Sequence, residues 1–382
     1  MFQHNLSRRD LIEGLLGLGI ASSAALVGRR ASAGQSKDVR VCVVTEPNGA
    51  HLSSYLESLK LCQGVKQIAL ADPSGQSFEQ ATSLLGSRGV SLQTFRDYRQ
   101  MLAAVRPQMA LVTLEPRNSP EAIEACLQAK CHVLTEKPAC IRVDDFAKLV
   151  QTAAAQQRQL MLALANRLGP PAQKAAELVR TGWLGKPYGT TIHLIADQTR
   201  LTRPSYQTSW RAAKSRAGGG HLIWLGIHYL DLIQFVTGDT ISQVSGLIQN
   251  VGGQPLDVED AAVASLQFKG GAVGTYHGGY YLDSGYQLGI HLWGSLGWLR
   301  FDPLISPLTW YSTHAAAPRG VQTFEFSISG GTAQYFPIVQ NAVDVARDAA
   351  EPIVTAEECL QILKVVFSIY RAAETGRRQT VE

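Results

Sequence analysis

A glycine-rich stretch near the middle of the chain carries the residues whose types and spacing most directly suggest chemistry. Three consecutive glycines at 218–220 precede an apolar run that is predicted to form a helix. Glycine allows a positive φ and a close approach of the backbone to another element or a ligand. Residues three, four and seven apart share one face of a helix. We therefore expect one face, predicted to be the wall of a pocket, to carry the side chains of His221, Trp224, Leu225, His228 and Asp231.

A second group with chemical potential is the tripeptide 136–138, Glu-Lys-Pro. It follows an apolar segment, 131–135, that is predicted to be a strand. Pro138 restricts Lys137 to an extended conformation, which can direct the ammonium into a crevice. A lysine that is partly desolvated there loses its proton near neutral pH and can act as a base.

Asp72 is placed where a dinucleotide is recognised. It ends the predicted second strand, some 20-odd residues after the first loop, where a carboxylate accepts hydrogen bonds from a ribose 2′-hydroxyl. This favours NAD over NADP as cofactor, because the carboxylate repels a 2′-phosphate. The alternative is an aspartate that forms a turn before Pro73.

The elements that position these groups alternate along residues 38–160. Predicted strands cover residues 39–45, 67–71, 109–114 and 131–135, with predicted helices at 50–61 and 120–129. Such alternation indicates a Rossmann-type, doubly wound parallel sheet, which binds ligands at the carboxyl ends of its strands. The loop after the first strand, residues 45–51, lacks the G-x-G-x-x-G pattern. It keeps only Gly49, and Glu46 would repel a pyrophosphate.

A second domain is predicted from 161 to 382. It opens with a strand at 161–165 and a helix at 171–181, followed by a strand at 188–196. After the glycine-rich helix come further predicted strands, at 244–251, 261–268, 272–279, 286–294 and 298–301. Several long strands in succession indicate an α/β domain with a large, open and mostly antiparallel sheet. We expect its open face to bind a ligand or a partner.

Residues 1–33 are predicted to be a signal peptide. Ser7-Arg8-Arg9 resembles a twin-arginine signal, an apolar core follows at 15–27, and residues 31–33 form a small-residue cleavage site. The core is too short for a membrane span, which needs about 20 residues. The sequence therefore predicts export by the twin-arginine route, to the periplasm or an equivalent compartment, and no membrane span after cleavage of the leader.

Composition narrows the class of partner. Hydrophobic residues make up 45% of the 382 residues and charged ones 17%, which is typical of a globular protein. The formal charge is only +4, and no basic cluster with interleaved aromatics stands out, so nucleic acid is not expected as a partner. The six cysteines include no CxxC pair and are predicted to be buried free thiols, with no metal site.

Taken together, these residues resemble the Gfo/Idh/MocA family over nearly all of the chain after the leader. The matching positions are the buried first strand, Ala71-Asp72-Pro73, Glu136-Lys137-Pro138, Asn166-Arg167, Trp210-Arg211, the glycines 218–220, Gly226-Ile227-His228 with Asp231, Glu259-Asp260 and Gly271. The resemblance implies a Rossmann domain that binds NAD or NADP, and a second domain that binds a sugar or polyol or forms homo-oligomers.

The resemblance also implies roles for single residues. Lys137 and His228 would serve hydride transfer, one as the base and the other polarising the substrate oxygen, with the two roles open. The cofactor would contact Thr45, Asn48, Gly49, Asp72, Pro116, Glu136 and Lys137. The substrate would contact Asn166, Arg167, Trp210, Arg211, Trp224 and Asp231. Asp231 would alternatively bond to the backbone of its own helix.

Three departures from the family pattern bear on function. The glycine loop is degenerate, Pro120 replaces a histidine, and Trp224 replaces an aspartate four residues before His228. The leading hypothesis is an exported NAD(P)-dependent oxidoreductase that acts on a sugar or polyol. The alternatives are a non-catalytic protein that binds a glycan or a partner on the same fold, and a glycosidase that retains bound NAD.

Overall fold

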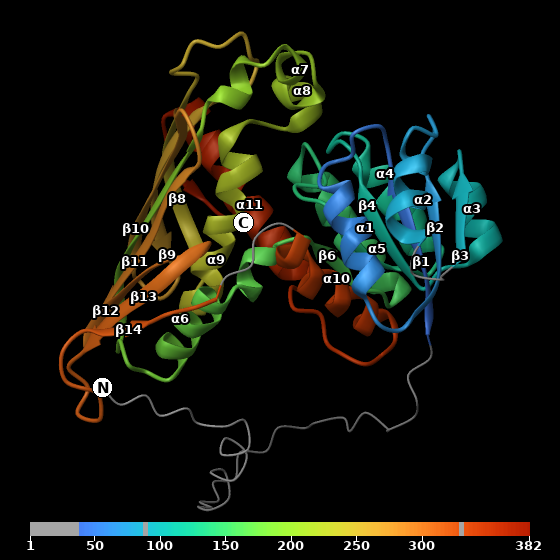
Figure 1. The fold of residues 1–382 in the computed structure, drawn as a ribbon. Helices are drawn as coiled ribbons and strands as arrows, with labels where there is room; N and C mark the ends of the chain where they lie inside the picture. Colours follow the sequence, from blue (N-terminus) through green and yellow to red (C-terminus); the bar gives the residue numbers. More distant parts are fainter. Residues whose placement is uncertain (1–37, 87–90, 328–331) are drawn as a thin grey trace, which may run out of the picture. The chain divides into compact units, whose positions relative to one another are not determined.

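Two β-sheets and the helices beside them make up residues 38–86, 91–327 and 332–382, which are the residues that this computed structural model describes (Figure 1). The predicted leader lies outside them. Ser36–Glu382 form one unit. In chain order, the strands and helices are β1 (Val39–Thr45), α1 (Leu52–Leu61), β2 (Val65–Ala71), α2 (Ser77–Leu85), β3 (Ser91–Phe95), α3 (Tyr98–Val105), β4 (Met109–Thr113), α4 (Ser119–Gln128), β5 (His132–Thr135), α5 (Val143–Gln156), β6 (Leu160–Leu162), η2 (Ala165–Leu168), α6 (Pro170–Arg180), β7 (Pro187–Asp197), η3 (Thr199–Thr202), α7 (Pro204–Gln207), η4 (Trp210–Ala212), α8 (Lys214–Ala217), η5 (Leu222–Gly226), α9 (Ile227–Thr237), β8 (Ile241–Gln249), β9 (Ala261–Phe268), β10 (Val273–Leu282), β11 (Tyr286–Gly294), β12 (Gly297–Asp302), β13 (Ile305–Ser312), β14 (Gln322–Phe324), α10 (Thr332–Ala346), α11 (Ala356–Thr375) and β15 (Gln379–Thr380).

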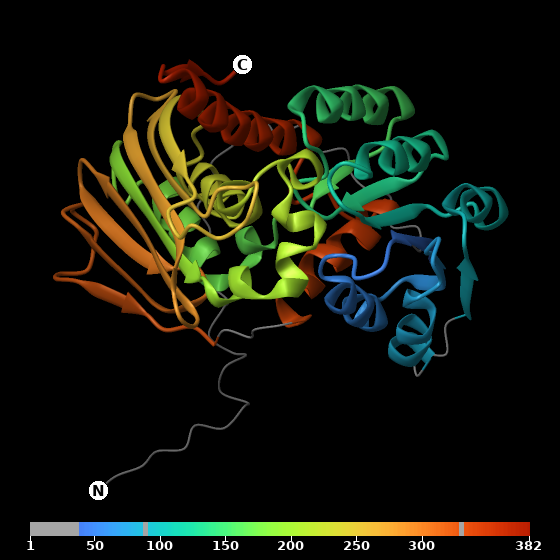
Figure 2. The same cartoon turned by 90° about the horizontal axis from the view of Figure 1, so that it is seen from above.

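The first sheet confirms the predicted Rossmann architecture. Its six strands are all parallel, in the order β3-β2-β1-β4-β5-β6. The central strand β1, with the sequence VRVCVVT, is buried at six of its seven positions, as expected of a strand covered on both faces. Figure 2 shows α1 and α2 on one side of this sheet and α4 and α5 on the other. The carboxyl ends of β1, β4 and β5 therefore lie next to one another.

The boundary between the two sheets differs from the prediction. The strand predicted at 161–165, at the start of the second domain, is instead β6, which pairs with β5 as the last strand of the first sheet. The chain also returns to the first sheet much later, because α10 packs against α1 and β5. Tyr335 of α10 places its ring 5.2 Å from that of Tyr55. Sequence order alone therefore does not separate the two sheets.

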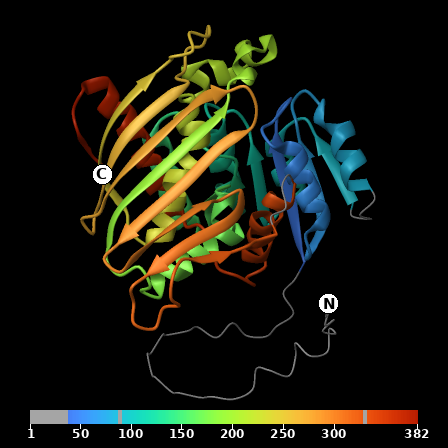
Figure 3. The same cartoon turned by 60° about the vertical axis from the view of Figure 1, so that its left-hand side comes forward.

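The second sheet is large and mostly antiparallel, as predicted. Its nine strands run in the order β14-β13-β12-β11-β7-β10-β9-β8-β15, and only β7 and β10 pair in parallel. The helices α6, α9 and α11 pack on one face. The described helices leave the other face open (Figures 1 and 3). Exposed apolar side chains on that face include Leu247, Val263, Val273 and Trp293.

Two further expectations concern the cysteines and membrane-spanning helices. All six cysteines are free and buried, as predicted. In the part of the chain that the structure describes, no helix is both long enough and apolar enough to cross a membrane.

Candidate active site

The candidate site lies where three parallel strands of the first sheet end. β1, β4 and β5 end at Thr45, Thr113 and Thr135, and each is followed by residues predicted to bind ligand. Such an edge collects backbone N–H groups and side chains from segments that are far apart in sequence. The Glu-Lys pair that follows β5 is the best-defined group there.

Lys137 is buried at the centre of this group, with 2% of its side chain exposed. Its Nζ donates a hydrogen bond of 2.6 Å to the main-chain oxygen of Trp224 and lies 4.1 Å from the centre of the Trp224 ring. Glu136 Oε1 lies 3.7 Å away. Burial lowers the pKa of Lys137 to about 8, although the negative charge of Glu136 opposes this shift. A pKa in this range is what a general base that works near neutral pH requires.

Glu136 stays charged because other groups hold its second oxygen. Oε2 accepts hydrogen bonds from the hydroxyl of Tyr55 and from His51, whose Nδ1 lies 3.1 Å away. Burial favours protonation of Glu136, but the charge and hydrogen bond of His51, together with Lys137 and Tyr55, outweigh it and hold the pKa of the carboxyl well below its ordinary value. A carboxylate is thus fixed beside the lysine across the physiological pH range.

His228 lies in the same surroundings but is kept neutral. Burial and the positive charge of Lys137 lower the pKa of His228 to about 3. Its Nδ1 is buried and has no hydrogen-bond partner among the described residues. The same is true of Glu136 Oε1 and Trp224 Nε1. Buried polar atoms are nearly always hydrogen-bonded, so unpartnered atoms around one lysine indicate a place built for a polar ligand.

The prediction that His221, Trp224, His228 and Asp231 share one helix face is wrong. Residues 222–226 form a π-helix, whose wider turn shifts every following side chain relative to α-helical spacing. His221 packs instead on the second sheet, where its Nδ1 lies 3.2 Å from the hydroxyl of Tyr276. Trp224 and His228 remain beside Lys137. π-helical turns of this kind occur frequently at functional sites.

Two of the three glycines serve close approach and Gly218 adopts a positive φ of 84°, as predicted. A Cβ on Gly220 would lie 1.9 Å from the main-chain oxygen of Glu259, and one on Gly219 would lie 2.0 Å from the hydroxyl of Tyr370. The Glu259 carboxylate in turn accepts hydrogen bonds from the N–H groups of Gly220 and Leu222, at 2.7 and 2.9 Å. This glutamate anchors the start of the π-helix and hence the position of Trp224.

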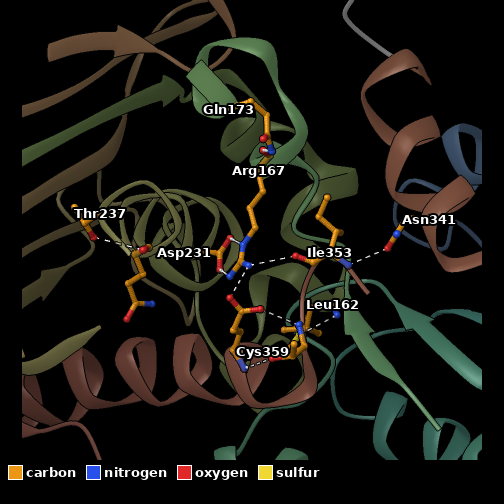
Figure 4. A network of polar contacts seen from close by, with 11 residues as sticks. Leu162, Arg167, Gln173, Asp231, Thr237, Asn341, Ile353 and Cys359 are labelled. Atoms are coloured by element: carbon orange, nitrogen blue, oxygen red, sulfur yellow. Dashed lines mark hydrogen bonds and ion pairs between the residues drawn. The ribbon is translucent and has the colours of Figure 1, made fainter. Parts of the chain in front are cut away.

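Arg167 and Asp231, predicted to contact substrate, bind each other. The guanidinium donates two hydrogen bonds to the carboxylate, at 2.8 and 2.6 Å, and both side chains are at least 96% buried (Figure 4). Glu358 holds the other side of the guanidinium at 3.0 Å. Asn166 is likewise engaged, because its Oδ1 accepts a hydrogen bond from Gln334. These three residues join η2 to α9, α10 and α11, and their geometry gives them a structural role.

Asp72 takes the alternative role as a turn former. Its carboxylate accepts hydrogen bonds from the N–H and hydroxyl of Ser74 and from the N–H of Ser77, at 2.8 to 2.9 Å. Burial raises the pKa of Asp72, but these hydrogen bonds outweigh it and hold the pKa below its ordinary value. The side chain is fully buried. The preference for NAD therefore gains no support from a free carboxylate at this position.

The loop between β1 and α1 is tightly folded. A Cβ on Gly49 would lie 2.4 Å from Thr45 Oγ1, and Asn48 has a φ of 57°. Glu46 turns its carboxylate toward the next strand end, where it accepts the N–H of Glu115, just before Pro116, at 2.6 Å. Burial raises the pKa of Glu46, so proton uptake would lessen its repulsion of a phosphate.

Trp210 and Arg211 complete the wall of the site. The Trp210 ring lies 5.0 Å from that of Trp224, and the Arg211 guanidinium lies 4.5 Å from the Trp210 ring. Of the residues predicted to bind substrate, these two and Trp224 are brought next to Lys137. The sequence predicted no role for His51 or Arg200. Glu259 was noted as a position that matches the family, but no role was predicted for it.

Two protein-family models match the chain. A family model described as "Oxidoreductase family, NAD-binding Rossmann fold" matches residues 48–164, and one described as "GFO/IDH/MocA C-terminal domain" matches residues 172–300. The chain belongs to the GFO/IDH/MocA oxidoreductase family, and its first sheet is an NAD-binding Rossmann domain.

Individual relatives are distant in sequence but similar over most of their length. The chain is 23% identical to the myo-inositol 2-dehydrogenase of Thermotoga maritima, over 86% of this chain and 95% of that protein. It is 24% identical to the D-glucoside 3-dehydrogenase of Escherichia coli K12, over 74% and 82%. A crystal structure of an oxidoreductase domain protein from Kribbella flavida has the same fold, with a TM-score of 0.80, 22% identity and coverage of 91% and 100%.

The residues at this edge fit a nicotinamide dinucleotide at its reacting end. The unpartnered atoms of Glu136, Trp224 and His228 surround Lys137, where a nicotinamide and a substrate would meet. The first turn of α1 offers backbone N–H groups for a pyrophosphate. Glu46 opposes phosphate binding while it is charged.

Proposed function

We propose that this protein is an NAD(P)-dependent oxidoreductase that oxidises a hydroxyl of a sugar or polyol, or reduces the corresponding carbonyl. The observation that carries the proposal is a buried lysine with a pKa of about 8 beside a neutral histidine, at the ligand-binding edge of an NAD-binding sheet. The sugar and polyol specificities in the names of the two curated relatives support the substrate class.

Oxidation of an alcohol releases a proton and a hydride, which must leave by different routes. Acceptance of the hydride is the chemistry that a nicotinamide would supply when bound at this edge. The proton goes to a base, and the best base has a pKa near the working pH. Lys137 meets this condition, whereas His228, with a pKa of about 3, does not. We therefore assign the proton to Lys137 Nζ and a hydrogen bond to the reacting oxygen to the neutral imidazole of His228.

The neighbours of Lys137 keep it ready for this task. Its hydrogen bond to the Trp224 carbonyl fixes Nζ without a second carboxylate, which would hold the proton more tightly. Glu136 supplies one fixed negative charge, so the ammonium that forms during oxidation is stabilised. In the reverse direction, the same ammonium returns the proton to the substrate oxygen.

The test is nicotinamide reduction by a panel of sugars and polyols, measured after mass spectrometry has identified any nucleotide released from the purified protein. We expect turnover by the native protein and none by Lys137→Met, with the nucleotide still bound. A protein that takes up neither NAD nor NADP would overturn the proposal in favour of a binding protein. Release of a sugar without net redox change would identify a glycosidase.

We further propose that the protein is exported by the twin-arginine route. The support is the order of the arginine pair, the apolar core and the small-residue site within residues 1–33. The test fuses these residues to a folded reporter in a bacterium. We expect the reporter to reach the periplasm, and the double change Arg8→Lys and Arg9→Lys to keep it inside. Export that does not depend on the arginines would refute the route.

We also propose that the protein self-associates through the open face of the second sheet. Leu247 and Val263 are directly opposed on β8 and β9, and both side chains point away from the helices. Exposed apolar side chains on one sheet face favour association. Light scattering should report an oligomer, and Leu247→Glu should shift it toward the monomer. A native monomer at micromolar concentration would refute this proposal.

A further inference from the structure

Lys137, Arg211 and Arg200 lie around the reacting end, and neither arginine forms an ion pair with a carboxylate of the described residues. The charges of Glu136 and Glu46 act on Arg211, but neither carboxylate is hydrogen-bonded to it. Lys137 has Glu136 as its one carboxylate neighbour. Arg211 has neither an ion pair nor a side-chain hydrogen bond among the described residues, although it is half buried. Its guanidinium lies over the Trp210 ring at 4.5 Å and lies 5.8 Å from the Trp224 ring.

Arg200 adds a third cation from the neighbouring segment η3. Its guanidinium lies 5.2 Å from the Tyr280 ring and donates a hydrogen bond of 2.9 Å to the Tyr286 hydroxyl. No carboxylate of the described residues forms an ion pair with it. Asp197 is the acidic group nearest in sequence, and its Oδ1 is occupied by the N–H of Thr199 at 2.7 Å. Arg200 therefore has no ion-pair partner among the described residues, although its charge interacts with those of Asp197 and Lys137.

Lys137, Arg211 and Arg200 are close enough to interact electrostatically. The pKa of Lys137 is lowered mainly by burial, and the charges of Arg211 and Arg200 lower it further. Arg211 and Arg200 both interact electrostatically with Tyr206 and Tyr280, which lie on the side of the second sheet. Trp224 Nε1 is buried and unpartnered between Lys137 and Arg211. A half-buried guanidinium held by aromatic rings is well suited to bind an oxyanion in two-pronged fashion.

We propose that the substrate is an acidic sugar, and that Arg211, assisted by Arg200, binds its anionic group while Lys137 faces the reacting hydroxyl. This inference rests on the proposed oxidoreductase function and names its substrate class. Both a carboxylate, as in a uronic or aldonic acid, and a phosphate ester have the chemistry that a guanidinium recognises.

The Trp210 and Trp224 rings lie beside the cations and can cover the apolar face of a sugar ring. The same rings exclude water, which strengthens the contact between guanidinium and anion. A neutral sugar would leave Arg211 without a hydrogen-bonded counter-charge, with only the unpaired charges of Glu136 and Glu46 acting on it. The charged group is therefore expected to contribute to affinity as well as to orientation.

The test compares matched pairs of ligands by calorimetry on the holoenzyme: D-glucuronate with D-glucose, D-galacturonate with D-galactose, D-gluconate with D-glucitol, and D-glucose 6-phosphate with D-glucose. We expect at least one acidic member to bind about ten- to hundredfold more tightly than its neutral partner. Preference for the phosphate ester or for the carboxylate identifies the anion. We expect Arg211→Gln to remove the preference, and Arg203→Gln, at an exposed arginine of the same region, to leave it intact.

Three results would overturn the inference. The first is equal affinity for both members of every pair. The second is no binding of any acidic sugar by protein that retains its nucleotide. The third is an Arg211→Gln variant that loses the nucleotide but keeps its preference for acidic sugars. Nicotinamide reduction is measured on the same samples. Turnover of neutral sugars only would refute the acidic substrate and keep the oxidoreductase. Tight binding of an acidic sugar with no redox turnover would support recognition of the anion and refute the oxidoreductase function.

Discussion

Lys137 is attached to Trp224 at two points: its Nζ donates to the main-chain oxygen at 2.6 Å and lies 4.1 Å from the centre of the indole ring. Neither the main-chain carbonyl nor the indole ring of Trp224 carries a formal charge, so these two contacts position the ammonium without strongly raising the pKa of Lys137. One residue of the π-helix thus fixes the position of the lysine, while burial accounts for most of the lowering of its pKa.

Replacing the indole by a carboxylate should make Lys137 a weaker acid. In Trp224→Asp, the new negative charge favours the ammonium and raises its pKa by about one unit or more. We expect the alkaline rise of kcat/KM to move to higher pH by the same amount. Trp224→Phe, which keeps a ring and the main-chain carbonyl, should move it far less. An unchanged profile in Trp224→Asp would show that the lysine does not control the rate.

The native enzyme should lose oxidation activity as the pH falls through the pKa of Lys137. Because burial lowers that pKa to about 8, the free amine is depleted below this pH, and kcat/KM for oxidation should fall about tenfold per pH unit. The measurement is a pH–rate profile from pH 5 to 10. Lys137→Arg should be inactive throughout, since a guanidinium does not release its proton in this range. A profile that stays flat from pH 5 to 10 would point to His228 instead, because its pKa of about 3 lies below this range.

The pair Arg167–Asp231 should matter for stability. In Asp231→Asn, the buried guanidinium loses its carboxylate, and we expect the free energy of unfolding to fall by about 3 kcal/mol. Urea denaturation measures this change. Glu358→Gln is the matched control, because Glu358 touches the same guanidinium but is 46% exposed, and it should cost less than about 1 kcal/mol. Similar losses in both variants would contradict the assigned role.

Gly220 should tolerate no side chain. The Cβ of Gly220→Ala would meet the main-chain oxygen of Glu259 at 1.9 Å, so the start of the π-helix must shift. We expect a loss of about 3 kcal/mol or more, together with lower turnover per folded molecule. Gly289→Ala is the control, because a Cβ there meets nothing within 4 Å. Equal behaviour of the two variants in melting experiments would contradict the close approach.

His221 should make the fold sensitive to acid. Burial, with Arg200 and His277 nearby, lowers its pKa from 6.5 to about 3, so the unfolded chain takes up a proton at a higher pH than the folded one. Its contribution to stability is therefore complete above pH 6.5 and is lost as the pH falls toward 3. Unfolding of His221→Gln should depend less steeply on pH across this window than unfolding of the native protein. His314 is exposed, and unfolding of His314→Gln should depend on pH as steeply as unfolding of the native protein.

Sequence patterns predicted four of the six strands of the first sheet, β1, β2, β4 and β5, because these are largely apolar runs, and its ligand edge follows from parallel topology. β3, with the sequence SLQTF, lacks this pattern and was not predicted, and β6 was assigned to the second domain. The position of Lys137 after β5 could be read from the chain because β5 is such an apolar run. The π-helix could not, since the apolar run from Leu222 onward is equally compatible with an α-helix. The pairing of Arg167 with Asp231, 64 residues apart, leaves no local signal. Asp72 had two local readings, and only its contacts with Ser74 and Ser77 decided between them.

The packing of α10 on α1 has a consequence for synthesis of the protein. Tyr335 places its ring 5.1 Å from that of His51, and His51 in turn holds Glu136 beside Lys137. A ribosome delivers the chain from its amino end, so β1 to β6 emerge long before the helix at 332–346 that completes their covering. The nascent amino-terminal half must therefore wait, partly uncovered, until nearly the whole message has been translated. The surroundings of Lys137 are therefore complete only after α10 has been synthesised.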